Sequence, residues 1–163
     1  ICYNELMKEL PLASPSAVAV LETPTRFLTE GRPDMPGRLA YSGRIQFFGG
    51  HIDLGPDGKP KETPLEAVER ELLEELNLTT ATPHRLWSGI VTSRLRDGTP
   101  ALRRVNVFHV PLHDDVKLRM NVPGSIVSIP KTEAAVTAHR DRMTSFAQYV
   151  LMRLLSGEHV WDI

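Results

Sequence analysis

The sequence has little of what marks secreted or membrane-spanning proteins. Cys2 is the single cysteine among 163 residues, so no disulfide can form within the chain, which fits a reducing compartment. No uncharged apolar run approaches the roughly 20 residues that a membrane helix needs. Glu5, Lys8, Glu9 and Pro15 make the first residues unlike a secretory signal. We therefore expect a cytoplasmic protein, and leave open whether a leader was removed.

The chain also lacks a strong excess of either charge. Its formal net charge is -1, so it has no overall basic field of the kind that attracts nucleic acid. A small phosphorylated ligand remains compatible, because it needs only a local cluster of cations. No Gly-x-Gly-x-x-Gly motif and no recognisable Ser/His/Asp arrangement is present. We expect neither nucleic acid nor a membrane as a partner.

Hydrophobic residues make up 41% of the chain and charged residues 24%, values typical of one globular domain. The apolar pattern predicts a short amphipathic helix at 1–10 and a linker at 11–16, followed by one domain over 17–163. Within that domain we expect strands at 17–21, 26–29, 39–48, 85–95, 103–110 and 126–129, and loops at 31–37 and 53–61. With helices at 63–76 and 144–155, this order predicts a layered α/β or α+β fold.

The helix at 63–76 has the strongest local signals. Thr63 is a good N-cap, Pro64 suits the first helical position, and Glu66 completes a capping box. Asn77 follows where a left-handed cap residue is favoured. The apolar stripe of this helix consists of Leu65, Val68, Leu72 and Leu76.

Three carboxylates share another face of the same helix. At about 100° per residue, Glu71, Glu74 and Glu75 fall within one arc, where they repel each other and oppose the helix dipole. A divalent cation would convert this repulsion into binding energy, and carboxylate oxygens suit Mg²⁺ or Mn²⁺. A solvated acidic face is the other interpretation of such a string. The flanking Gly49-Gly50 favours the metal site, because bare glycines allow a close approach of the backbone.

The stretch from Gly50 to Leu78 resembles the Nudix box, Gly-x5-Glu-x7-Arg-Glu-apolar-x-Glu-Glu-x-Gly-apolar, of the MutT-like Nudix hydrolases. The residues that fill the pattern are Gly50, Glu62, Arg70, Glu71, Leu72, Glu74, Glu75 and Leu78. Two features depart from it: eleven residues rather than five separate Gly50 from Glu62, and Asn77 replaces the glycine. Neither departure removes a carboxylate.

The resemblance implies a mixed β-sheet between helices and attack of water on a pyrophosphate, in a nucleoside diphosphate derivative, with Mg²⁺ or Mn²⁺ as cofactor. It implies Glu71 and Glu75 as first-choice metal ligands, Glu74 as a third and the Gly49 carbonyl as a fourth. Arg70 would pair with an acid and orient it, Glu62 being the family's usual partner. Glu71 is also a candidate general base. Asp114 and Asp115 are another source of the base, although a plain turn is the more economical interpretation.

Several other residues carry weaker signals. Arginines around the turn at 97–98 could bind phosphates or form ordinary surface: Arg94, Arg96, Arg103 and Arg104. Residues with similarly open interpretations are Lys59 and Lys61 in the inserted loop, the spaced pair His109 and His113, and the aromatic Trp87 and Phe108.

The downstream sequence does not identify the substrate. The region 92–94 lacks the proline that marks many ADP-ribose hydrolases. Two other classes of function stay open, a non-catalytic Nudix-fold binding or regulatory module and an α/β domain with a chance acidic helix. A homodimer is also left open.

Overall fold

The computed structural model describes residues 10–35, 42–95 and 97–157, and its centre is a mixed seven-stranded sheet in that part of the chain. The main path has the order β3-β2-β1-β6-β5, while β4 pairs with β1 and β7 with β2. β1 and β6 run parallel, and the other pairs are antiparallel. The strands are β1 Leu12–Glu22, β2 Arg26–Gly31, β3 Ile45–Gln46, β4 Phe48–His51, β5 His84–Arg94, β6 Pro100–Pro111 and β7 Ser125–Pro130.

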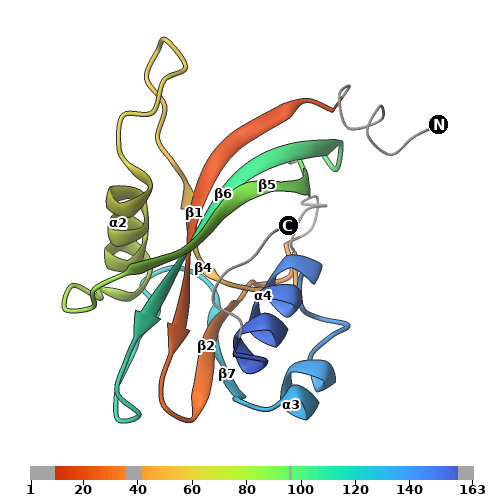
Figure 1. The fold of residues 1–163 in the computed structure, drawn as a ribbon. Helices are drawn as coiled ribbons and strands as arrows, with labels where there is room; N and C mark the ends of the chain where they lie inside the picture. The colour runs from red at the N-terminus through yellow and green to blue at the C-terminus, as the bar shows by residue number, and fades with distance from the viewer. Residues whose placement is uncertain (1–9, 36–41, 96, 158–163) are drawn as a thin grey trace.

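Helices cover the sheet from two sides (Figure 1), as the sequence predicted. Helix α2, Pro64–Leu76, packs through Val68 and Leu72 against a core formed with β1 and β4. Helices α3, Glu133–Ala138, and α4, Ser145–Leu155, pack over a second core that includes Phe27 and Ile129. No helix in the described ranges is long and apolar enough to cross a membrane.

Helix α2 forms as its local sequence dictates. The Thr63 side chain accepts a hydrogen bond from the Glu66 N–H, and the Glu66 side chain accepts one from the Thr63 N–H, which completes the capping box. Asn77 ends the helix with φ 53°, in the left-handed region. The predicted stripe holds except at Leu65, which is 41% exposed. Ala67, rather than Leu65, is fully buried. The buried face of the helix is therefore shifted toward the side that carries the carboxylates.

Other boundaries differ from the prediction. Residues 12–16, predicted as linker, belong to β1, which tolerates Pro15 because a bulge interrupts its pairing with β6 between Ala13 and Ser16. β2 continues to Gly31. Of the predicted strand at 39–48, residues 39–41 lie outside the described residues, and the rest is interrupted, with only the short β3 and the first residue of β4 as strand. Helix α3 was not predicted from the sequence. The helix predicted at 1–10 lies almost wholly outside the described residues, as does part of the loop at 31–37.

Candidate active site

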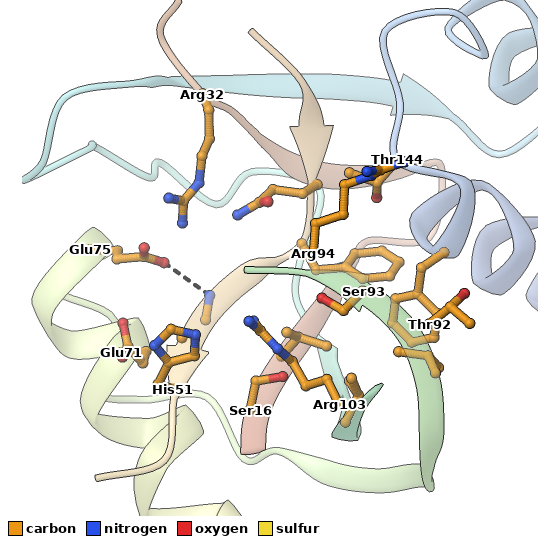
Figure 2. Close-up of a pocket in the computed structure, with 18 of the residues that line it drawn as sticks. Ser16, Arg32, His51, Glu71, Glu75, Thr92, Ser93, Arg94, Arg103 and Thr144 are labelled. Atoms are coloured by element: carbon orange, nitrogen blue, oxygen red, sulfur yellow. Dashed lines mark hydrogen bonds between the residues drawn. The ribbon is translucent and has the colours of Figure 1, made fainter. Parts of the chain in front are cut away.

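A cavity of about 550 Å³ lies between helix α2 and the start of α4. Glu71 and Glu75 form one end of its lining, and Thr144 belongs to the other (Figure 2). Phe146, from the first turn of α4, also lines the cavity. The sheet and its loops supply the rest of the wall: Ser16 and Val18 from β1, Arg32 after β2, Gln46, Phe47, Gly49, Gly50, His51 and Asp53 in and around β3 and β4, Val91 to Arg94 from β5, and Arg103 and Val105 from β6. The cavity therefore collects side chains from segments far apart in the sequence.

The two glycines of β4 seat the carboxylates of α2. The Gly49 N–H donates a hydrogen bond to Glu75 Oε2 over 3.0 Å. A Cβ at Gly50 would come within 2.2 Å of Glu71 Oε1, and one at Gly49 within 2.3 Å of the Ala17 carbonyl oxygen. Gly49 also has φ 126°, which favours glycine. This close packing explains the double glycine and fixes where both carboxylates lie.

Burial and mutual repulsion make these carboxylates unfavourable as free anions. The pKa of Glu75 is raised to about 7, first by burial and then by the negative charge of Glu30. The pKa of Glu71 is also raised, mainly by burial, although the adjacent Arg70 opposes this shift. A divalent cation beside them would favour the charged forms of both carboxylates.

Arg70 joins the acidic helix to the inserted loop. Its Nη2 and Nε donate to the two oxygens of Glu62 over 2.7 and 3.1 Å, and its Nη1 donates to Glu71 Oε1 over 2.9 Å. The Arg70 hydrogen bond is the largest cause of the lowered pKa of Glu62. Glu62 also accepts from the Asp53 N–H at 2.9 Å. The six extra residues of the loop therefore leave Glu62 within reach of Arg70, as the motif requires.

Glu74 differs from the other two acids. Its side chain is 56% exposed and lies 3.4 Å from Arg70 Nη1, outside the cavity lining. The described residues hold no group of three His, Cys, Asp or Glu side chains arranged to bind a metal ion. Glu71 and Glu75 nevertheless fit one: they are hard oxygen donors, their charged forms are disfavoured without a cation, and Gly50 leaves space for the Glu71 carboxylate.

The weaker sequence candidates divide into two groups. Arg94 and Arg103 line the cavity, whereas Arg104 is exposed and Arg96 lies outside the described residues. The other candidates do not line the cavity. Asp114 accepts a hydrogen bond from Thr25, Lys59 forms an ion pair with Asp57, and His109 lies against Glu22. Phe108 and Trp87 are buried in the core, and the remaining candidates outside the lining are Lys61, His113 and Asp115.

The sequence analysis missed a polar cluster beside Glu75. Glu30 is 3% exposed and accepts hydrogen bonds from Arg32 Nε over 3.1 Å and Gln46 Nε2 over 2.8 Å. Arg32 and Gln46 both line the cavity, as does His51. The spacing of Glu30 and Arg32 at the end of a strand was the available signal, but their proximity to α2 depends on the fold.

Comparison with known proteins supports the fold. No family model and no curated protein matches the sequence. An Ap4A hydrolase from C. elegans, 16% identical, superposes with a TM-score of 0.65 over 89% of this chain and 97% of its own. A MutT protein from Methanosarcina mazei, 16% identical, gives a TM-score of 0.64 over 91% and 96%.

A third similar structure is a bifunctional NMN adenylyltransferase/ADP ribose pyrophosphatase from Francisella tularensis, complexed with AMP and a Mn ion. It is 18% identical, with a TM-score of 0.57 over 94% of this chain and 45% of its own. Further similar structures are Nudix hydrolases. The chain thus has the MutT-like Nudix fold, which confirms the fold that the motif at 50–78 predicted.

Proposed function

We propose that this chain is a metal-dependent hydrolase that cleaves a pyrophosphate linkage in a nucleoside diphosphate derivative. The single observation that carries the proposal is the seating of Glu71 and Glu75 against Gly49 and Gly50 at the wall of an open cavity. The fold is shared with proteins described as MutT, an Ap4A hydrolase and an ADP ribose pyrophosphatase, which supports the same class of reaction.

Glu71 and Glu75 would hold the cation, with Glu74 and the Gly49 carbonyl as further ligands. A bound Mg²⁺ or Mn²⁺ would neutralise phosphate oxygens and acidify a water molecule. The protein contributes preorganised geometry: the Gly49 N–H orients Glu75, and Arg70 orients Glu71 while Glu62 holds Arg70 in place. Glu71 also remains our candidate for the general base, because its carboxylate lies at the cavity wall.

A panel of nucleoside diphosphate derivatives tests the proposal. Purified protein is incubated with Mg²⁺ or Mn²⁺ and a dinucleoside polyphosphate, a nucleoside diphosphate sugar or a nucleoside triphosphate, and the released nucleotide or phosphate is quantified. We expect cleavage of at least one compound by the wild type and none by the Glu71→Gln, Glu75→Gln double variant. Equal activity in both would show that another site or a contaminant is responsible, and a folded protein that binds but cleaves none would indicate a binding module.

A further inference from the structure

The cavity has a cationic wall as well as an acidic one. Three arginines line it, Arg32, Arg94 and Arg103, from different parts of the sheet. Arg32 donates to Glu30, and Arg94 Nη1 donates to the Gly98 carbonyl over 2.9 Å. Arg103 differs from both, because within the described residues its guanidinium has no hydrogen bond or ion pair, and its Nε is buried without a partner.

The strand geometry aims Arg103 into the cavity. On β6, Arg103 pairs with Val91 of β5, and both residues line the cavity. The next residue, Arg104, pairs with Ile90, and both are exposed on the opposite face. Figure 2 shows Arg103 and His51 reaching toward one another, with Glu71 and Glu75 beyond His51.

The guanidinium groups give this wall its positive charge. Arg103, Arg32 and His51 all line the same cavity. An unsatisfied, buried guanidinium N–H is unfavourable in the free protein, and an anion that accepts its hydrogen bond would relieve that cost.

We propose that Arg103 binds a phosphate of the substrate, across His51 from the acids of α2. A guanidinium is the preferred donor for phosphate oxygens, since it can form two parallel hydrogen bonds. One phosphate would lie by Glu71 and Glu75, and the neighbouring phosphate would bind Arg103. This assignment selects ligands that carry at least two linked phosphates, and it rests on the proposed function for the class of ligand.

The first experiment measures binding without catalysis. Methylenediphosphonate with Mg²⁺ serves as the probe, because it offers two linked phosphonates, no base and a bridge that water does not cleave. Calorimetry should show binding to the wild type, with affinity reduced about tenfold in Arg103→Gln, as loss of one charge-assisted contact implies. Arg104→Gln is the matched control and should stay within about twofold of the wild type. Equal affinities in wild type and Arg103→Gln, or no binding to the wild type, would overturn the inference.

Two further readouts separate a binding role from a structural one. Arg103→Gln should melt at the same temperature as the wild type or higher, since it removes an unpaired buried donor. With the substrate identified from the panel, the KM of Arg103→Gln should be about tenfold above that of the wild type, while kcat changes less than about threefold. If the wild type hydrolyses that substrate and Arg103→Gln has the same KM, the inference fails while the proposed function stands. If the probe binds through Arg103 but nothing is hydrolysed, the phosphate site stands and the hydrolase proposal fails.

Discussion

At the scale of single residues, the contact between Gly50 and Glu71 explains why position 50 of this chain is a glycine. Sequence analysis could identify both residues, because the motif fixes their order and the helical period groups Glu71 with Glu75. It could not show that the Glu71 carboxylate occupies the space of a Cβ at Gly50, 2.2 Å from where that atom would lie. Any side chain at Gly50 must therefore displace the carboxylate or the strand.

Gly50→Ala is expected to lower kcat on the order of a hundredfold, since small misplacements of reacting groups have effects of that size. The fold should persist, because alanine can adopt the φ of Gly50 and the nearest atoms that the added Cβ would meet belong to the Glu71 side chain. Kinetics and a thermal melt measure the two effects. Gly58→Ala is the control: φ 75° makes it strained, but nothing lies within 4 Å, so it should lose stability and keep kcat. Full activity in Gly50→Ala would contradict the proposed seating of Glu71.

The raised pKa of Glu75 predicts how stability depends on pH when no metal is present. A carboxyl whose pKa is about 7 in the folded state and near 4.5 in the unfolded state binds an extra proton on folding between these values. Its contribution to stability is full below pH 4.5 and is lost as the pH rises through 7. Melting temperatures in EDTA should thus decline over this range more steeply for the wild type than for Glu75→Gln.

The wild type must be compared with Glu75→Gln because His51 changes stability with pH in the opposite direction to Glu75. Its lowered pKa adds stability as the pH rises toward its unfolded value of 6.5, and this contribution is common to both proteins. Glu69→Gln, at an exposed position of the same helix, should reproduce the wild-type profile. Parallel profiles for wild type and Glu75→Gln would show that Glu75 does not carry this titration.

At the scale of elements, prediction from sequence succeeded where the signals are local. Helix α2 was predicted with its N-cap and C-cap, because capping residues and apolar spacing act within a few positions. β1 was predicted too short, because Pro11 and Pro15 suggested a linker, whereas its pairing with β6 is about 90 residues distant and invisible locally. The six-residue α3 was missed, although Thr132 caps it through the Ala135 N–H.

The sequence predicted a loop at 53–61, and this segment is exposed in the structure apart from Gly55. It closes on itself through the Gly55 N–H to the Lys59 carbonyl and a bridge between Leu54 and Pro60. Of the loop, only Asp53 lines the cavity. The sequence analysis considered Lys59 as a substrate contact, but Lys59 pairs with Asp57 within the loop.

Deleting residues 54–59 restores the usual spacing before Glu62 and retains Asp53, whose N–H bonds to Glu62. We expect the fold and kcat to persist, and KM to change more than kcat, because none of the deleted residues lies in the cavity wall beside the carboxylates. Steady-state kinetics and a thermal melt with Mg²⁺ are the measurements. A folded, metal-responsive variant with kcat lowered by orders of magnitude at unchanged KM would place a catalytic group in the loop.

At the scale of the whole molecule, the sheet brings together groups that sequence reasoning could not join. The acids of α2 were identified from their spacing alone, and the resemblance supplied Glu62 as the partner of Arg70. Arg32, His51 and Thr144 come from three other segments, and only the sheet topology brings them to one cavity. The fold could therefore be predicted in outline and one wall of the site in detail, while the opposite wall required tertiary structure.

The central claim is that the carboxylates of α2 support hydrolysis through a bound divalent cation. The most direct test takes the compound that the panel identifies and measures its rate of cleavage with Mg²⁺, with EDTA, and after Mg²⁺ is restored. We predict that the wild type cleaves the compound with Mg²⁺, stops in EDTA, and recovers fully when Mg²⁺ is restored. Restoring Mg²⁺ should produce no such cleavage in Glu75→Gln. Cleavage that continues unchanged in EDTA would contradict the central claim.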